Sequence, residues 1–296
     1  MISEEKDPSG YFAKSILEPS CDIPAPVLLD INWMKANMPA SPADSNKGTF
    51  GKALLLAGSD LYPGAAFLAA KACLAGGCGI LTVISAEEAR ACFASLPEAI
   101  FRTGKAFLTE DIIRSADAVG IGPGWGSSPD MQAAEMALMY AKKLLIDADA
   151  LNLLSRRNEL KSLLSERCVI TPHPGEMSRL TGMPVSKIVQ DPVGVAYRFA
   201  CERNCTVLLK GTCTVIAGRD AIAITAEGNN GLAKGGSGDV LSGLITAMLC
   251  RGKDPFEAAC LGSLLLGAGA EQAFDSLRTR LLRASDITDA IMKGIL

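Results

Sequence analysis

A glycine-rich segment followed by one carboxylate and an apolar run is the part of the sequence best suited to chemistry. It reads GGSGDVLSG, with Asp239 directly after the last of three glycines. The residues whose backbone N–H groups could form an anion hole are Gly235, Gly236, Ser237 and Gly238. The positive end of the helix expected to follow would add to the attraction for an anion such as a transferring phosphoryl group. Asp239 could then accept the proton of an attacking hydroxyl, but Asp is also an ordinary helix-capping residue. The spacing does not decide whether Asp239 is a catalytic base or a helix cap, and one residue can have both roles.

Further polar residues follow expected strands. Lys210 ends the run VLLK and could neutralise a phosphate, although a solvated lysine at a strand end is the plainer interpretation. His173, the only histidine, lies between two prolines in TPHPGE, and this rigid loop favours ligand contact slightly over a structural turn. Asp147 and Asp149 follow a strand on the same side. They could hold water, magnesium or a ligand hydroxyl, while capping by Asp149 is equally open.

The elements that must position these residues alternate along the chain from residue 47 onward. Buried strands are expected at 52–58, 79–85, 206–212, 213–218 and 221–225. Three more are expected to run into polar segments: into a glycine loop within 116–124, into carboxylates within 143–150 and into a proline-rich loop within 168–176. Helices are expected at about 31–38 and at 64–77, 86–96, 128–142, 191–204, 236–252 and 254–274. This order predicts an α/β fold with a mostly parallel central sheet and helices on both faces. The polar loops should meet at one rim, where the carboxyl ends of the strands line a crevice.

Composition excludes several classes of function. A net charge of −3 argues against general nucleic-acid binding, and no GxxxxGK[ST] phosphate loop or GxGxxG fingerprint is present. One histidine makes a Cys/His zinc site or a serine triad improbable, and ten cysteines without a CxxC pair indicate buried, reduced thiols. The N-terminus lacks the apolar region of a signal peptide, and the most apolar stretch, 258–274, is shorter than the ~20 residues of a membrane span. We therefore expect a cytoplasmic protein without membrane segments.

The motifs taken together resemble one family. GIGPGWG, LLIDADALNLL, ITPHPGEMSRLTG, LLKGTCTV and GNNGLAKGGSGDVLSG occur in the order found in the ADP/ATP-dependent NAD(P)H-hydrate dehydratases, which have the ribokinase-like fold. The resemblance covers roughly residues 47–275. It implies one ribokinase-like dehydratase domain over residues 47–296. Residues 1–46 are rich in proline, serine and charge with weak periodicity, and we expect them to form an N-terminal arm.

The resemblance implies repair of damaged nicotinamide cofactors by a carbon–oxygen lyase. Such an enzyme dehydrates the S epimer of hydrated NADH or NADPH, with ADP or ATP as phosphoryl donor and Mg²⁺ as cofactor; with ADP it releases AMP and phosphate. Asp239 would accept the proton of the C6 hydroxyl. Residues implied to contact the hydrated dinucleotide are Ala65 (or its neighbour Ala66), Gly124, His173 and Asp239. Residues implied to line the adenine nucleotide site are Lys210, Gly211, Thr212, Cys213, Thr214 and Gly238; no residue is assigned as a metal ligand.

The chain departs from the family pattern at Asn230, Leu266 and Met177, where proline, histidine and an aromatic residue are common. The family is often fused to a hydrate epimerase domain, for which residues 1–46 are too short, so we expect an epimerase on a separate chain. A homotetramer is also implied. The alternative function is a ribokinase-like kinase of a vitamin-precursor alcohol, and a non-enzymatic nucleotide sensor is the third possibility. The sequence does not decide whether ADP or ATP is the phosphoryl donor, or whether hydrated NADH or hydrated NADPH is the preferred substrate.

Overall fold

The computed structural model describes residues 23–126, 130–277 and 282–294, with the side chains of all of them except Lys105 and Asn230. Within these residues the strands form one ten-stranded sheet in the order β1-β10-β9-β8-β7-β6-β5-β2-β3-β4. Only β9 runs antiparallel to its neighbours, so the predicted mostly parallel sheet is confirmed. The strands are β1 Val27–Leu29, β2 Lys52–Leu56, β3 Ile80–Ser85, β4 Ala99–Thr103, β5 Ala118–Ile121, β6 Leu144–Ile146, β7 Cys168–Ile170, β8 Thr206–Leu209, β9 Thr214–Ala217 and β10 Ile222–Thr225.

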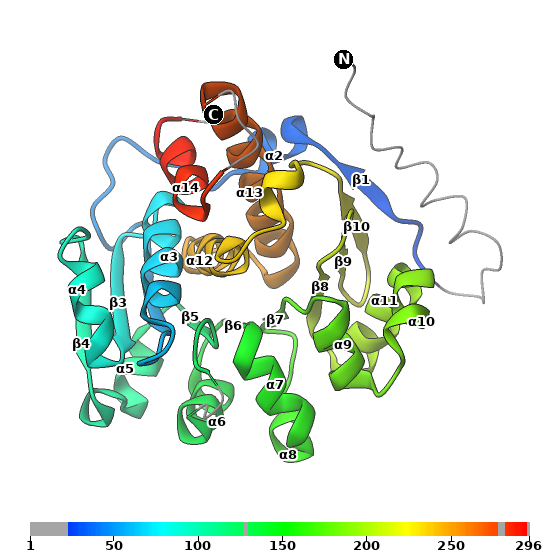
Figure 1. The fold of residues 1–296 in the computed structure, drawn as a ribbon, viewed down its shortest axis with the longest axis horizontal. Coiled ribbons are helices and arrows are strands. Elements are labelled where there is room, and N and C mark those ends of the chain that lie inside the picture. Colours follow the sequence, from blue (N-terminus) through cyan, green and yellow to red (C-terminus); the bar gives the residue numbers. More distant parts are fainter. Residues whose placement is uncertain (1–22, 127–129, 278–281, 295–296) are drawn as a thin grey trace.

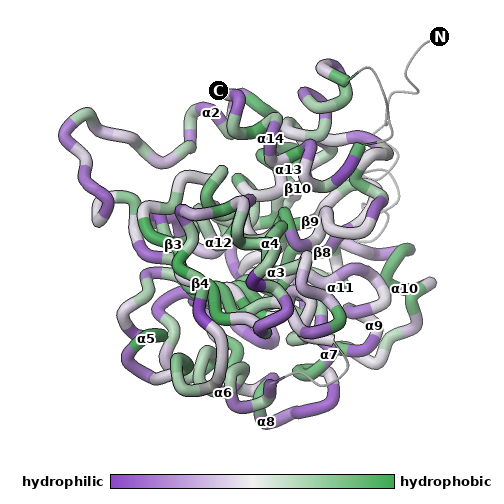
Figure 2. The backbone as a smooth tube through the Cα atoms, turned by 60° about the vertical axis from the view of Figure 1, so that its left-hand side comes forward, coloured by the Kyte–Doolittle hydropathy of each residue, from purple (hydrophilic) through white to green (hydrophobic). Residues whose placement is uncertain are grey.

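Helices cover both faces of this sheet, as predicted (Figure 1). One face packs against α2 Ile31–Asn37, α3 Pro63–Ala75, α4 Arg90–Phe93, α12 Ser237–Cys250, α13 Pro255–Leu277 and α14 Ala284–Met292. The other packs against α5 Glu110–Ser115, α6 Met131–Tyr140, α7 Ala148–Arg156, α8 Asn158–Lys161, α9 Pro174–Thr181, α10 Val185–Gln190 and α11 Pro192–Arg203. Figure 2 shows the hydrophobic residues concentrated toward the middle of the molecule.

The central strands are short and apolar throughout because both of their faces are buried. Every residue of β5, β6, β7 and β8 is buried, and their side chains alternate between the two cores. The chain runs from β2 to β3 and β4 on one side of β2, and then returns to place β5 on its other side. This reversal creates a topological switch point, where α/β sheets bind their ligands. The loops after β2 and β5 meet there, since the Gly58 N–H donates to the Pro123 carbonyl at 2.7 Å.

Several boundaries differ from those predicted. The helix expected over 86–96 is broken into a 3₁₀ turn, Glu87–Ala89, and the single turn of α4. The strand β4 was not predicted; it is a half-exposed edge strand that carries Arg102. The strand β7 ends at Ile170 and is followed by the expected proline-rich segment, but this segment is not all loop, because α9 begins within it at Pro174. Proline lacks an N–H for a sheet but suits the first position of a helix. The strand β1 and the helix α14 were also missed.

Residues 23–46 contribute to the sheet and its covering layer. The predicted short helix is confirmed as α2, whose Asp30 accepts a hydrogen bond from the Trp33 N–H at 2.9 Å. Met34 of α2 is fully buried, and β1 pairs in parallel with β10. This part of the predicted arm therefore packs on the body of the molecule. The domain boundary near residue 46 remains a prediction, and residues 1–22 lie outside the described residues.

The cysteines and the apolar helices bear on the composition argument. All nine cysteines that the structure describes are free thiols, and most of them are buried. No helix among the described residues combines the length and apolar character needed to cross a membrane.

Candidate active site

The helix α12 begins at the glycine turn, and no side chain that the structure describes caps its N-terminus. Gly236 is the residue before the helix and has φ of 94°, a left-handed conformation that glycine adopts without strain. Asp239 lies in the first turn and forms no hydrogen bond or ion pair with another described residue. The capping interpretation of Asp239 therefore finds no hydrogen bond to support it. Its carboxylate is left available to a ligand.

The surroundings of Asp239 raise the pKa of its carboxyl group toward neutral pH. Burial, with a further contribution from the negative charge of Asp147, raises the pKa of Asp239 from 3.8 to about 7, although Lys210 opposes the shift. A base with a pKa near the working pH combines a substantial ionised fraction with useful proton affinity. Perturbed carboxylates of this kind are concentrated at functional sites.

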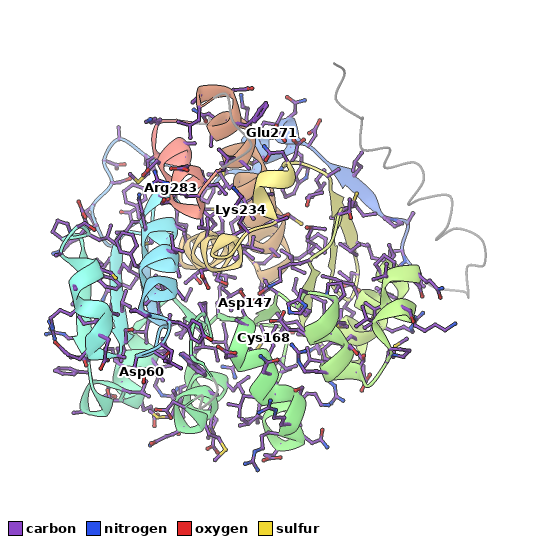
Figure 3. All side chains as sticks on the ribbon, viewed as in Figure 1. Asp60, Asp147, Cys168, Lys234, Glu271 and Arg283 are labelled. Atoms are coloured by element: carbon purple, nitrogen blue, oxygen red, sulfur yellow. The ribbon has the colours of Figure 1, made fainter. Side chains whose placement is uncertain are left out.

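The buried Asp147 forms an ion pair with the partly exposed Lys210 beside Asp239. Asp147 directly follows β6 and lies between the start of α7 and α12 (Figure 3). Its Oδ1 accepts a hydrogen bond from Lys210 Nζ at 2.9 Å, and its Oδ2 accepts one from Ser242 Oγ at 2.7 Å. Burial alone would raise the pKa of Asp147, but Lys210 and these hydrogen bonds hold it below its ordinary value. Lys210 is thus fixed at the site, and the interpretation of it as a solvated lysine at a strand end is wrong.

His173 organises the loop beside this pair. It precedes α9, and its Nδ1 accepts hydrogen bonds from the N–H groups of Gly175 at 2.9 Å and Glu176 at 3.4 Å. The carboxylate of Glu176 accepts the His173 N–H in return at 2.8 Å and lies 3.7 Å from Lys210 Nζ. Burial, with help from Lys210 and Arg179, lowers the pKa of His173, so the ring is neutral at neutral pH. The single histidine therefore has a structural role, which leaves its predicted contact with substrate untested.

A cavity of about 960 Å³ opens at the switch point of the sheet. Ala65, Gly124 and Asp239, three of the residues predicted to contact substrate, line it together. Ala66 is fully buried and does not, which decides between the two alanines in favour of Ala65 as the cavity residue. A Cβ atom at Gly124 would lie 2.5 Å from that of Ala65, so only glycine allows the loop after β5 to approach α3 this closely.

Asp149 supports the wall of this cavity. Its Oδ2 accepts the Gly126 N–H at 2.7 Å, and its Oδ1 accepts a hydrogen bond from Asn152 at 3.2 Å. Asp149 therefore fastens the glycine loop to α7 instead of capping its own helix. Asp147 and Asp149 have different partners, and the expectation that both lie on one side of a strand is wrong because β6 ends at Ile146.

The predicted nucleotide residues lie around Lys210. Gly211 and Thr212 are exposed in the turn between β8 and β9, whereas Cys213 is buried and Thr214 starts β9. A Cβ at Gly238 would lie 3.7 Å from Asp147 Oδ2 and 3.9 Å from Lys210 Nζ, which places the start of α12 against the ion pair.

The predicted anion hole lies at the start of α12 and stays a prediction. The first N–H groups of α12 have no partner within the helix, and the buried Ser237 Oγ has none either. Gly235 instead lines a separate cavity of about 440 Å³ together with Lys234 and Arg283. Gly238 is therefore the glycine of this turn that adjoins the ion pair.

The sequence reasoning missed several residues of the cavity. They are Tyr62, Met131, Asn152, Leu153, Arg156 and Arg157. A helical spacing could have revealed part of this set, since 149, 152, 153 and 156 recur at intervals of three and four after the DADA motif. The three departures from the family pattern lie elsewhere: Met177 and Leu266 are buried core residues, and the side chain of Asn230 lies outside the described residues.

The parallel sheet and the carboxylate at the start of α12 define a ribokinase-like α/β protein. A crystal structure of a ribokinase-like superfamily protein from Enterococcus faecalis matches this fold with a TM-score of 0.81 at 26% identity, covering 94% of this chain and 98% of that one. The predicted fold class is confirmed.

The chain belongs to the NAD(P)H-hydrate dehydratase family, whose model matches residues 53–293. It is 36% identical over 263 residues to the ADP-dependent (S)-NAD(P)H-hydrate dehydratase of Bacillus subtilis, covering 87% of this chain and 94% of that protein. A crystal structure of the Bacillus subtilis ADP/ATP-dependent enzyme, co-crystallised with ATP and Mg²⁺, matches with a TM-score of 0.78 at 32% identity over 92% of this chain and 98% of that one. The chain also spans about half the length of bifunctional NAD(P)H-hydrate repair enzymes, 52% in one and 50% in another. The family predicted from the motifs is confirmed.

Proposed function

We propose that this chain removes water from the S epimers of hydrated NADH and NADPH, with ADP as phosphoryl donor and AMP and phosphate as products. The names of its relatives support this activity. The observation that carries it is the free carboxylate of Asp239, which borders the 960 Å³ cavity and has its pKa raised to about 7. It lies beside the Asp147–Lys210 pair, whose ammonium group could attract a phosphate.

The proposed chemistry turns a poor leaving group into a good one. Asp239 takes the proton of the C6 hydroxyl as its oxygen attacks the terminal phosphorus of ADP, and the bond from that phosphorus to AMP breaks. The ring nitrogen then donates its electron pair, the C6–O bond breaks and phosphate leaves. Loss of the C5 proton restores the dihydropyridine ring. No electrons are exchanged with another molecule, so the overall reaction is an elimination driven by cleavage of ADP.

The nucleotide is proposed to bind over Lys210 and the turn that follows it. Gly211, Thr212, Cys213 and Thr214 would line the adenosine end, and Gly238 would adjoin the phosphates. Lys210 would attract the phosphates, but its ion pairs with Asp147 and Glu176 would weaken that attraction. The sequence predicts His173 as a substrate contact, and this remains part of the proposal.

Magnesium is proposed to arrive with the nucleotide. No group of three acidic, histidine or cysteine side chains among the described residues could hold a metal ion. Mg²⁺ commonly takes one or two carboxylates and completes its coordination with water and phosphates. The nearby carboxylate of Glu176 already accepts the His173 N–H and lies beside Lys210, so water and phosphate oxygens would supply most of the ligands of such an ion. When bound, the ion would neutralise charge on the phosphates.

The remaining partners belong to the proposal as well. Relatives that are bifunctional repair enzymes support a functional pairing with a hydrate epimerase. A homotetramer and a cytoplasmic location are proposed from the family resemblance, and sedimentation of the purified chain tests the first of these.

One assay separates the three candidate functions. Purified protein is mixed with hydrated NADH, ADP and Mg²⁺, and the absorbance band of the reduced nicotinamide is followed. Return of this band, with AMP and phosphate released in equal amounts, is the expected result. A stable phosphate ester without return of the band would identify a kinase. Nucleotide binding without any turnover would identify a sensor, and either outcome would reject the dehydratase.

A further inference from the structure

The 960 Å³ cavity carries opposite charges toward its two ends. Asp239 and Asp149 line it near the start of α7, and Arg156 lines it from the last turn of the same helix. Asp149 and Arg156 lie seven residues apart on one face of α7, which corresponds to roughly 10 Å along the helix axis. Asn152 and Leu153 line the cavity between them. The cavity therefore runs along α7 from a negative end to a positive end.

Arg156 is an exposed side chain that has no partner among the described residues. It forms no hydrogen bond or ion pair with a described residue, whereas Nη1 of its neighbour Arg157 lies 3.8 Å from the carboxylate of Glu159. A basic residue in the last turn does favour the helix dipole. The dipole requires only a positive charge near the end of the helix, however, and does not require that the charge face a cavity. An unpaired guanidinium at a cavity wall is suited to a planar, doubly hydrogen-bonded anion.

We propose that Arg156 binds a phosphate group of the hydrated dinucleotide and so fixes its direction in the cavity. This inference rests on the proposed function, which places the C6 hydroxyl at Asp239. The phosphates of the same substrate must then lie away from the two carboxylates, because like charges repel. Arg156 supplies the attraction at the opposite end. The substrate thereby enters with its uncharged hydrated ring toward the acidic end.

Two phosphates of the substrate class could be the partner. The pyrophosphate is present in both hydrates, whereas the 2′-phosphate is present only in hydrated NADPH. Both offer the same chemistry to a guanidinium. If Arg156 binds the pyrophosphate, loss of its charge should weaken the binding of both hydrates equally. If it binds the 2′-phosphate, only the binding of hydrated NADPH should weaken.

The test compares Arg156→Gln and Arg156→Lys with the wild type. Arg198→Gln is the matched control, because Arg198 is an exposed arginine of α11 that pairs with Asp191 and does not line the cavity. We expect Arg156→Gln to raise KM about tenfold for one or both hydrates with a smaller change in kcat, and Arg156→Lys to recover part of the loss. Values of KM within twofold of wild type for both hydrates would overturn the proposal.

A binding measurement keeps this test separate from that of the proposed function. NADPH and NADH, the proposed products, are titrated into each variant and followed by the fluorescence of the reduced nicotinamide. Weaker binding to Arg156→Gln, and unchanged binding to Arg198→Gln, supports the phosphate contact even if turnover is absent. Equal binding to all variants contradicts the contact, whereas failure of the wild type to turn over either hydrate contradicts the proposed function.

Discussion

Asp239 has a stability cost that follows from its place in the site. Its carboxylate is largely removed from water, faces the charge of Asp147 and has no hydrogen-bond donor among the described residues. Ionising it in the folded protein is therefore unfavourable. Such a group persists in proteins mainly where function requires it.

Replacing this carboxylate should stabilise the protein, and more so at high pH. The folded pKa of about 7 is above the ordinary 3.8, so wild-type stability falls as pH rises from about 4 to about 7 and Asp239 loses its proton. Asp239→Asn should raise the unfolding temperature by several degrees at about pH 8 and by less at about pH 5, where Asp239 is still neutral in the folded protein but already ionised in the unfolded chain. Thermal unfolding at the two pH values measures the difference. An equal change at both pH values would contradict the assigned pKa.

The pH dependence of turnover tests the same carboxylate and its neighbour. Because Asp239 must be ionised to act as a base, kcat/KM should fall about tenfold per pH unit below pH 7 and level off above it. Lys210 lowers the pKa of Asp239, so Lys210→Gln should move the midpoint to higher pH, apart from any loss of nucleotide affinity. Lys142→Gln, which removes an exposed lysine paired with Asp117, is the control. An unmoved midpoint in Lys210→Gln would argue against this coupling.

At the scale of the elements, the site depends on how closely α12 approaches α3. A Cβ atom at Gly243 of α12 would overlap the carbonyl oxygen of Ala69 and lie 2.8 Å from the Cβ of Ala72. Since α3 carries Ala65 and α12 carries Asp239, this contact sets the width of the cavity between them. The close approach is possible because small residues line both helices.

Widening this contact should damage both stability and activity. Gly243→Ala must push the two helices apart, and we expect it to cost about 2 kcal/mol or more of the free energy of unfolding and to raise KM. Gly64→Ala is the matched control on α3, since no atom would lie within 4 Å of its Cβ. Chemical denaturation of both variants measures the difference. Similar free energies of unfolding for Gly243→Ala and Gly64→Ala would show that α3 and α12 can accommodate the added methyl group.

The sequence predicted the helices and strands that have strong local signals. The strands β2, β3, β5, β6 and β8 lie within their expected ranges because short, continuous apolar runs leave few alternatives. The edge strand β4 was missed because half of its residues face solvent, and pairing with β3 decides its conformation. The helix α9 was missed because TPHPGE was interpreted as a loop, although it contains a proline at a helix start and a residue that caps it.

At the scale of the whole molecule, the sequence predicted where the site lies, at one rim of the sheet, but not which side chains contact one another there. The polar ends of β5, β6, β7 and β8 meet as the parallel order required, and α12 brings Asp239 to them. The pairing of Asp147 with Lys210 joins residues 63 positions apart, and no local pattern encodes such a contact. The cationic end of the cavity was missed although Arg156 shares a helical face with Asp149, because only the fold shows that this face borders the cavity.

The most direct test of the account is the turnover of hydrated NADH with ADP by Asp239→Asn. Loss of a general base typically costs 10²–10⁴-fold, so we expect kcat to fall by at least about a hundredfold. Calorimetry should find ADP affinity nearly unchanged, and Asp111→Asn, an exposed aspartate of α5, should behave as wild type in both measurements. A near-normal kcat in Asp239→Asn would contradict the assignment of Asp239 as the base that activates the hydroxyl.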